Sequence, residues 1–233
     1  QFVPIREKIN EAIDFFDIIC RGKNQEDPGL DVFERNFLEE ALKYLYTEDP
    51  RFRYGTHPDT LYEEKPRVEN GLIIQTKVKK LEPTLTDVFN YLSQKYGDEP
   101  RAHRLLAAIR PFLRDGSKPI FDGQTYFGKD LEGVNIHTAR LVNFNLKDME
   151  EGFLKPVAYH VILHYIWEYF VKNVENELKK KIVYADEFWT LVDNEATVAF
   201  SEKMARRCRK RNCGFRIASQ DFVRILESKK ARG

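Results

Sequence analysis

The stretch Lys181-Ile-Val-Tyr-Ala-Asp-Glu187 decides the fold class of this 233-residue chain. Its short apolar run is typical of a central strand in a parallel sheet, and two acids follow the run directly. Cys213-Gly-Phe-Arg-Ile-Ala218 has the same character, and a helical pattern over about 195–212 separates the two runs. Strand, helix and strand in this order predict parallel strands joined by a right-handed crossover.

The α/β pattern extends on both sides of this stretch. Residues 140–146 alternate between two sets of side chains, as in a strand, and residues 151–174 are apolar over most of a helical girth. A helix that is apolar on nearly all sides is usually buried between layers. Residues 221–226 predict the start of one more helix.

The first half of the chain has helical patterns. Apolar side chains recur at three- and four-residue steps over residues 5–20 and 33–45, so each set falls on one helical face. Thr84 and Asp87 have capping-box spacing and predict the start of a third helix. Pro100 suits the first turn of a fourth.

Residues 50–83 interrupt these helices. They are rich in proline, tyrosine and charge, with one apolar run at Leu72-Ile-Ile74. We interpret them as an extended loop with room for one short strand. The chain therefore divides into a helical subdomain at 1–117, which contains this loop, and an α/β domain at 118–233.

Charge is unevenly placed along the chain. Overall, 38 basic and 37 acidic residues give a net charge of +1. Residues 201–233 contain eleven basic and three acidic residues, so they carry +8 and residues 1–200 carry −7. This asymmetry indicates an anionic partner such as phosphate or nucleic acid, although a solvated helix face gives the same pattern.

Composition excludes several classes of protein. No run of about 18 apolar residues predicts a transmembrane helix, and the charged start is unlike a signal peptide. Three cysteines cannot form a disulfide framework, and the C-x4-C pair at Cys208 and Cys213 has no second ligand pair for zinc. We therefore expect free thiols. Because the chain does not begin with Met, we also expect a piece of a longer protein.

The two acids after residues 181–185 suit a site that hydrolyses nucleotides. In open parallel sheets, ligands bind outside the carboxyl ends of the strands, where Asp186 and Glu187 are expected. Asp186 can hold, through water, the Mg²⁺ that bridges the phosphates, and Glu187 can polarise the attacking water. The alternative is a strand that ends in two solvated acids.

Two further features favour the nucleotide site. Ser219-Gln220 follows the next predicted strand, so the amide of Gln220 would lie beside the acids and sense phosphate or orient water. Residues 203–211 contain six basic residues and no acid. A motor that assembles as a ring delivers an arginine to its neighbour's phosphates. The alternative for this basic run is a solvated or nucleic-acid-facing surface.

Four motifs together resemble the ATPases that energise type IV secretion and conjugative DNA transfer. That family has Phe-Asp-Gly-x-Thr, Asp-Glu-Phe/Ala-Trp after an apolar strand, an Arg-Lys pair before Asn or Gly, and a strand ending in Thr/Ser-Gln. In the same order and spacing, this chain has Phe121-Asp-Gly-Gln-Thr125, Asp186-Glu-Phe-Trp189, Arg209-Lys-Arg-Asn212 and Ser219-Gln220. The likeness covers about residues 118–226, and residues 1–117 resemble the family's helical insertion in general character.

The resemblance implies a partial parallel P-loop-type sheet with flanking helices plus an all-helical subdomain. It implies an ATPase that uses ATP and Mg²⁺, with a Walker B strand ending at the two acids, to drive DNA or protein transfer and pilus assembly. The roles implied are Asp186 for Mg²⁺ through water, Glu187 as general base, Gln220 as sensor and Arg209 as the arginine acting on a neighbouring subunit. Arg206, Lys210 and Arg211 are the substitutes for Arg209 at the nucleotide.

The same resemblance implies partners and a location. We expect self-association into a hexameric ring, contacts with other secretion-system proteins, and DNA as a further partner. The expected location is cytoplasmic, peripheral to the inner face of the bacterial cell membrane.

One element of the family pattern is missing. The nearest match to its phosphate-binding loop, G-x4-G-K-S/T, is Gly123-Gln-Thr-Tyr-Phe-Gly-Lys-Asp130, in which Asp130 replaces the hydroxyl that binds Mg²⁺. We expect the true loop upstream of Gln1. A second interpretation therefore stays open, in which the chain is a non-catalytic module that binds proteins or DNA through its basic helix.

A histidine pair completes the candidate residues. His160 and His164 have metal-ligand spacing on a helix, but the Glu that a zinc protease carries after the first His is absent. On a mostly apolar helix we expect both to be packed histidines.

Overall fold

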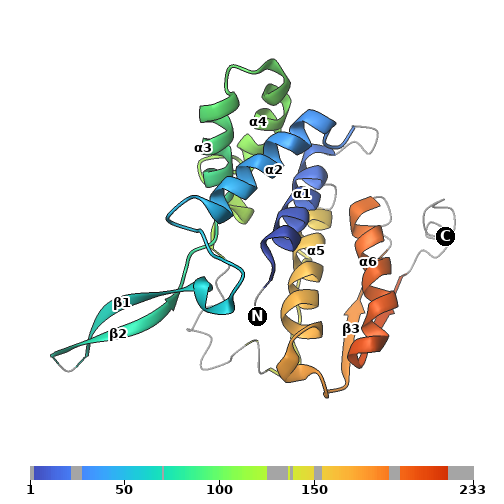
Figure 1. Ribbon diagram of the computed structural model, residues 1–233. Helices are drawn as coiled ribbons and strands as arrows, with labels where there is room; N and C mark the ends of the chain where they lie inside the picture. Colours follow the sequence, from blue (N-terminus) through green and yellow to red (C-terminus); the bar gives the residue numbers. More distant parts are fainter. Residues whose placement is uncertain are drawn as a thin grey trace. The chain divides into compact units, whose positions relative to one another are not determined.

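The computed structural model describes residues 3–21, 28–69, 71–124, 136, 139–149, 154–188 and 195–219 (Figure 1). The chain forms two compact units, one of residues 2–16 and 30–126 and the other of residues 1, 17–29 and 127–233. We name the first the helical unit and the second the α/β unit. The predicted boundary between residues 117 and 118 stays a prediction.

The helices lie where hydrophobic periodicity or a capping signal predicts them. The α-helices are α1 (Ile5–Arg21), α2 (Val32–Thr47), α3 (Leu85–Tyr96), α4 (His103–Ile109), α5 (Leu154–Tyr165) and α6 (Glu195–Cys208). The strands are β1 (Tyr62–Glu69), β2 (Leu72–Lys79), β3 (Lys181–Ala185) and β4 (Cys213–Ile217). Short 3-10 turns are η1 (Pro58–Leu61), η2 (Pro100–Ala102), η3 (Arg110–Phe112), η4 (Pro119–Phe121), η6 (Val174–Asn176) and η8 (Arg209–Arg211), and η5 (Ile166–Val171) is a π-helix.

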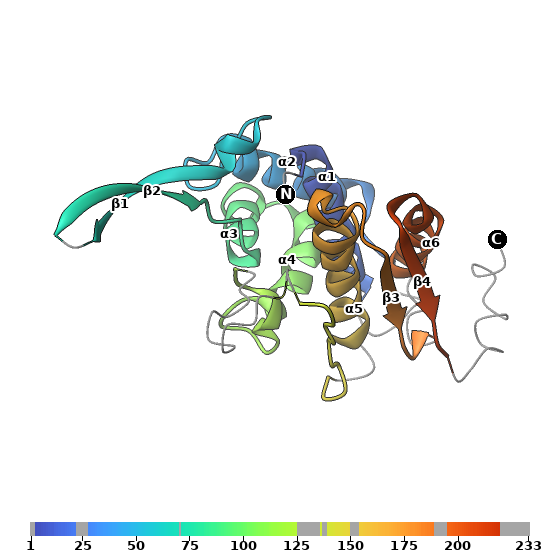
Figure 2. The ribbon, with the colours of Figure 1, turned by 90° about the horizontal axis from the view of Figure 1, so that it is seen from below.

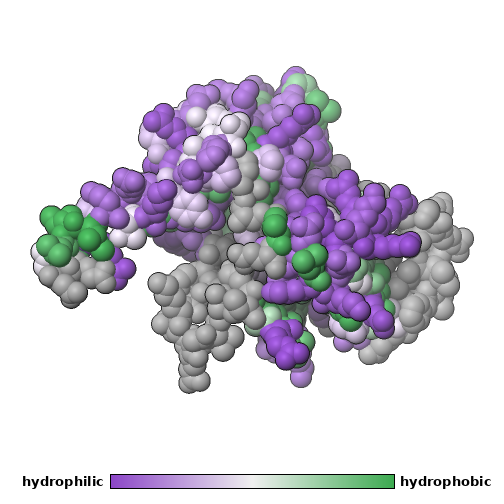
Figure 3. Space-filling model, turned by 60° about the horizontal axis from the view of Figure 1, so that its bottom comes forward, coloured by the Kyte–Doolittle hydropathy of each residue, from purple (hydrophilic) through white to green (hydrophobic). Residues whose placement is uncertain are grey.

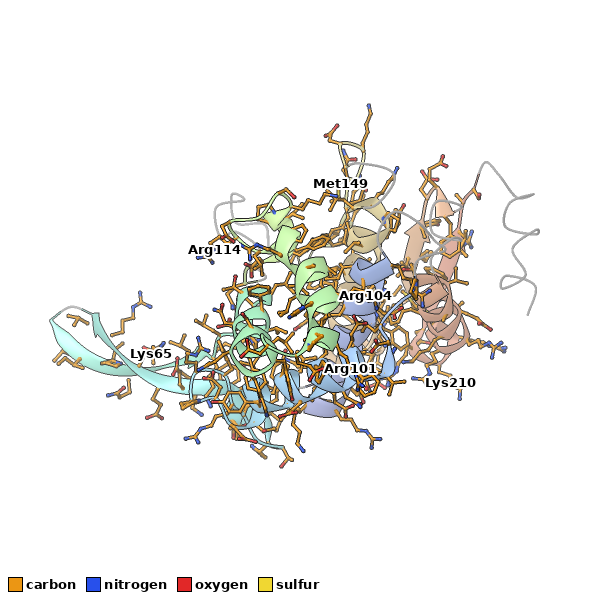
Figure 4. The ribbon with its side chains drawn as sticks, turned by 90° about the horizontal axis from the view of Figure 1, so that it is seen from above. Lys65, Arg101, Arg104, Arg114, Met149 and Lys210 are labelled. Atoms are coloured by element: carbon orange, nitrogen blue, oxygen red, sulfur yellow. The ribbon has the colours of Figure 1, made fainter. Side chains whose placement is uncertain are left out.

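In the helical unit, a buried glutamate joins two helices. Glu34 closes the capping box of α2, where its backbone N–H donates to Asp31 Oδ1 at 2.8 Å and Asp31 N–H donates to Glu34 Oε2 at 2.9 Å. The Glu34 side chain is fully buried, and Arg104 of α4 forms an ion pair with it, with Nε 2.8 Å from Oε1 (Figure 4). The same carboxylate therefore starts α2 and ties it to α4.

Asp122, from the Phe-Asp-Gly motif, has a structural role in this unit. Its buried carboxylate accepts hydrogen bonds from Thr86 N at 3.0 Å, Thr86 Oγ1 at 2.5 Å and Arg114 N at 2.7 Å. Gln124 adds a second link, since its amide donates to Glu82 O at 2.6 Å and accepts from Glu82 N at 3.0 Å. These bonds fix the start of α3 against the chain that follows α4.

The extended loop predicted at 50–83 is wrong where the chain forms β1 and β2, while the short strand expected at Leu72-Ile-Ile74 lies within β2. β1 and β2 form an antiparallel hairpin of eight-residue strands, with Glu69 opposite Leu72 and Tyr62 opposite Lys79. Gly71 turns the chain with φ of 80°. The sequence Asn70-Gly71, followed by the aliphatic run Leu72-Ile-Ile74, is a hairpin signal that the loop interpretation does not use.

The α/β unit contains the predicted parallel pair. β3 pairs with β4 in parallel, from Lys181 opposite Cys213 to Ala185 opposite Ile217, and Figure 2 shows the two strands side by side. α5, η5 and α6 pack on one face of the pair through a cluster of buried side chains: Leu163, Trp167, Val171, Val183, Phe200, Met204, Cys208 and Cys213. The fold class is mixed α/β, as the sequence predicts.

The strand predicted at 140–146 and the helix predicted at 221–226 are not confirmed. Residues 141–146 form neither helix nor strand, so the strand predicted at 140–146 is wrong. Alternating side chains need a hydrogen-bonded neighbour to become a strand, and none pairs with this segment in the described part of the chain. The helix predicted at 221–226 lies outside the described residues.

The first prediction concerns Asp122. Because Asp122→Asn replaces an acceptor of three hydrogen bonds by a group with one acceptor oxygen and an N–H₂ donor, it should lower the free energy of unfolding by about 2–4 kcal/mol. Urea unfolding of the purified chain measures this. Asp115→Asn is the matched control, since Asp115 is exposed, and it should change stability by less than about 0.5 kcal/mol.

The same residue predicts a pH dependence. Burial opposes ionisation of Asp122, but the bonds from Thr86 and Arg114 outweigh it and hold its pKa below the ordinary 3.8. A depressed pKa in the folded state gives stability that is present above 3.8 and lost as the pH falls through the folded value. Wild type should therefore lose its advantage over Asp122→Asn in that acidic range, and a constant difference would contradict the assignment.

Candidate functional site

The carboxyl edge of the β3–β4 pair brings the predicted acids together with the end of the next strand. Ala218 N–H donates to Ala185 O at 2.9 Å, and Phe188 N–H donates to Ala218 O at 3.2 Å. These two bonds continue the pairing beyond the strands. Asp186 and Glu187 therefore lie beside Ala218 and Ser219, as the strand order predicts, while Gln220 lies outside the described residues.

The turn after β3 has an unusual backbone. Glu187 has φ of 52°, in the left-handed region that non-glycine residues rarely adopt. Its N–H donates to Asp186 Oδ1 at 3.0 Å. Backbone strain of this kind concentrates at functional sites, because the surrounding structure must hold it in place.

Tyr159 of α5 supports this turn from the helix layer. Its hydroxyl donates to Asp186 O at 2.5 Å. Burial raises the pKa of Tyr159, and the negative charges of Asp186 and Glu187 raise it further, so the phenol stays protonated and keeps donating. Sequence reasoning missed this residue, because nothing in the pattern around residue 159 links it to a turn 27 residues later.

The two acids differ in their exposure. Asp186 is exposed, whereas Glu187 is half-buried, and Phe188 beyond them is buried with Ala185 against Tyr159. One Asp186 oxygen is engaged by the Glu187 N–H, and an exposed carboxylate can also accept from metal-bound water. The edge thus presents a solvent-facing carboxylate and a partly sheltered one next to each other.

The donor set at this edge fits Mg²⁺. Magnesium in nucleotide sites keeps several waters and takes one or two protein carboxylates together with phosphate oxygens. Asp186 is the residue that would supply such a hard oxygen ligand. In the described part of the chain no group of three or more His, Cys, Asp or Glu side chains is arranged to hold a metal, so a site made of side chains alone is not found there.

The basic residues lie at the opposite edge of the strand pair. η8 directly precedes β4, and Lys181 N–H donates to Asn212 O at 2.9 Å at the start of β3. Five strand residues at about 3.3 Å each separate the two edges by roughly 16 Å. The structure therefore does not bring Arg209, Lys210 or Arg211 to the acids of the same chain.

Two details define this basic edge. Lys210 lies beyond the end of α6 (Figure 4), and Arg206, one turn earlier, forms an i,i+4 ion pair with Glu202. Asn212 adopts φ of 52° and its side-chain N–H donates to Glu177 O at 3.0 Å. The η8 turn is thus fixed to the segment that leads into β3, with Arg209 and Lys210 exposed and Arg211 half-buried.

Lys181 fixes the same edge from inside the protein. It is buried, and its ammonium donates to Val171 O at 3.1 Å and Asn176 O at 2.9 Å. These carbonyls belong to the end of the π-helix η5 and to η6. Burial lowers the pKa of Lys181. The side chain is too enclosed to contact a ligand, so its role is to join α5 and η5 to the strand that carries the acids.

The histidine pair is packed, as expected from its apolar helix. His160 is 2% exposed and its ring nitrogens have no hydrogen-bond partner among the described residues. Burial, and then the neighbouring His164, lowers its pKa to about 3. His164 stacks on Phe200 with ring centroids 3.7 Å apart. A neutral, enclosed His160 contributes packing to the core.

The cysteines are free thiols in the described residues. Cys208 ends α6 and Cys213 begins β4, and both are buried. A hydrogen bond between the two thiols raises the pKa of Cys208 and lowers that of Cys213. They pack in the core of the α/β unit.

Comparison with known proteins identifies one fold. No protein-family model matches the chain, and no curated protein sequence is similar to it. Among solved structures, the chain is similar to VirB4 of Thermoanaerobacter pseudethanolicus, with a TM-score of 0.64 and 19% identity over 98% of this chain and 69% of that one. In the described residues no helix is long and apolar enough to cross a membrane. At this identity the comparison shows that the chain has a VirB4-like fold.

Proposed function

We propose that this chain is part of an ATP-hydrolysing motor that energises type IV secretion or conjugative transfer of DNA or protein, including pilus assembly. The observation that carries the proposal is the placement of Asp186 and Glu187 beside Ser219 at the carboxyl edge of a parallel strand pair. The VirB4-like fold over nearly the whole chain supports the same proposal.

The two acids have distinct proposed roles. Asp186 would hold Mg²⁺ through water, and the ion would neutralise charge on the phosphates of bound ATP. Glu187, half-buried and held by the strained turn, would accept the proton of the attacking water. Gln220 would follow Ser219 as the sensor of the phosphate.

The basic edge supports a role between subunits. Arg209 lies on the far edge of the strand pair from the acids of its own chain, and this position supports the proposal that it acts on a neighbour's phosphates. Arg206, Lys210 and Arg211 are its proposed substitutes. This arrangement suits self-association, proposed as a hexameric ring, with secretion-system proteins and DNA as further partners at the inner face of the membrane.

A non-catalytic function is the second candidate. Its support is the solvent-facing basic turn at the end of α6, which can bind DNA or an acidic protein without nucleotide chemistry. The two candidates differ in whether Glu187 matters for turnover.

The second prediction therefore concerns Glu187→Gln. The test protein is the full-length product of the gene that encodes this chain. Because the amide keeps the size of the side chain but cannot accept the proton, ATP should still bind while hydrolysis falls by roughly 10²-fold or more. Turnover of radiolabelled ATP and nucleotide binding are measured on the same samples, with Glu48→Gln as the control, since Glu48 is exposed at the end of α2 in the helical unit. Unchanged turnover would favour the non-catalytic candidate.

The third prediction tests action between subunits. Arg209→Ala should reduce hydrolysis by about 10³-fold or more, the range found for arginines that act on a neighbour's phosphates. Arg209→Lys should recover little, because lysine lacks the planar fork. When Arg209→Ala and Glu187→Gln subunits are mixed, an intact acid site can receive an intact arginine, so activity should return. Mixed assemblies that stay inactive would remove Arg209 from this role.

The fourth prediction tests the strained turn without any nucleotide. At φ of 52°, Glu187→Gly should be more stable than Glu187→Ala by about 1 kcal/mol, since only glycine avoids the Cβ penalty. The control pair is Glu202→Gly and Glu202→Ala in α6, where the order should reverse by about 0.5–1 kcal/mol. Urea unfolding measures both pairs. If Glu187→Ala were instead more stable than Glu187→Gly, as expected within a helix, the turn at residue 187 would not be strained.

A further inference from the structure

The end of the β1–β2 hairpin exposes aliphatic side chains to solvent. Val68, Leu72 and Ile73 are 72%, 69% and 74% exposed, and Ile74 beside them is 40% exposed. We name these four residues the hairpin tip, and Figure 3 shows a hydrophobic patch at this end of the hairpin. Soluble proteins rarely leave such a cluster uncovered unless it meets a partner.

The register distributes the tip over both faces of the hairpin. Val68 and Ile73 lie directly opposite each other and share one face, whereas Leu72 and Ile74 belong to the other. Along both strands nearly every described side chain is exposed, so neither face is covered by the helical unit. A partner must therefore enclose the tip from two sides.

Basic residues follow the tip on both faces. β2 and the next residue carry Lys77, Lys79 and Lys80 without an acid, and β1 adds Lys65 behind the tip (Figure 4) and Arg67, which lies opposite Ile74 of the tip. Against these five cations residues 62–80 carry three acids, which leaves +2. Glu63 pairs with Lys65 at 2.6 Å, which neutralises one acid and one base and leaves the net charge of +2 unchanged, and Lys79 lies 3.5 Å from Glu82 just beyond the hairpin. The stem behind the tip is thus suited to an anionic surface.

An added protein strand fits this hairpin less well. Pro66 lies in the middle of β1 and has no N–H to donate, so the outer edge of that strand cannot pair continuously. Pairing along an edge would also leave the apolar side chains on both faces uncovered. Apolar side chains on both faces of the tip, with basic residues behind them, favour an environment that contacts both faces at once.

We propose that the hairpin tip inserts into the interfacial layer of an anionic lipid membrane, with the basic residues of the stem at the headgroups. Three residues of each strand span about 10 Å, which matches the depth of about 5–10 Å reached by interfacial segments. Deeper insertion would strip water from unpaired backbone groups at the strand edges, so the insertion is shallow. The proposal rests on the hairpin alone and does not depend on ATP hydrolysis.

The binding test uses the whole chain and sedimentation with vesicles. Wild type should bind vesicles of phosphatidylcholine and phosphatidylglycerol, and pure phosphatidylcholine much less. Ile73→Asp should weaken binding by about tenfold or more, because a buried aliphatic group is replaced by a charge. The control is Leu178→Asp, which introduces the same negative charge at a leucine of the α/β unit that is 92% exposed. This variant should bind vesicles like wild type. Circular dichroism confirms that both variants are folded.

A second measurement separates the tip from the basic residues of 201–233, which can also attract anionic vesicles. The indole introduced by Ile73→Trp should be quenched by brominated lipid, whereas the one introduced by Leu178→Trp should not. Lys77→Gln with Lys79→Gln should weaken binding by several-fold per lysine at low salt. Each variant signal is read against the quenching of the native tryptophans in wild type.

Three results would overturn the proposal. One is equal binding of wild type and Ile73→Asp, and another is an Ile73→Trp indole that lipid does not quench. The third is self-association in ultracentrifugation without lipid that Ile73→Asp abolishes, which would make the tip a protein contact.

Discussion

The parallel register of β3 and β4 is the constraint on which the candidate site depends. Because Ala185 lies opposite Ile217, the acids after β3 and the polar end of β4 emerge at one edge. The same register sends the basic turn before β4 to the other edge. A shift by one residue would turn the inward side chains of a strand outward, so packing of Val183 and Cys213 against α5, η5 and α6 fixes the register and, with it, the site.

Two polar contacts hold this geometry from the helix layer. The buried ammonium of Lys181 ties the start of β3 to the end of η5, and the hydroxyl of Tyr159 holds the turn after β3. The first acts at the basic edge and the second at the acidic edge. Together they bind both ends of one strand to the helix packed on it, which lets the turn keep Glu187 in a strained conformation.

Local signals in the sequence predicted the local structure well. Periodicity located α1, α2 and α6, capping-box spacing located α3, and the apolar run at 181–185 located β3. The features that the sequence did not predict depend on a neighbouring strand or on a contact with residues far along the chain. The segment at 140–146 has the alternation of a strand but no paired strand among the described residues, and the roles of Asp122 and Tyr159 come from residues 36 and 27 positions away. The hairpin is the exception, because Asn70-Gly71 is a local turn signal within a segment whose charge and proline content favour a loop.

The opposition of the two edges bears on how the proposed motor would work. The acids and the basic turn lie at opposite ends of one strand pair. Because the strands hold these ends apart, the two groups do not meet within one chain. In the proposed motor they would meet when the carboxyl edge of one copy faces the amino edge of the next, a head-to-tail contact that forms a ring if the rotation closes. Hydrolysis in such a motor would then require assembly, and each copy would contribute the base to one site and the arginine to another.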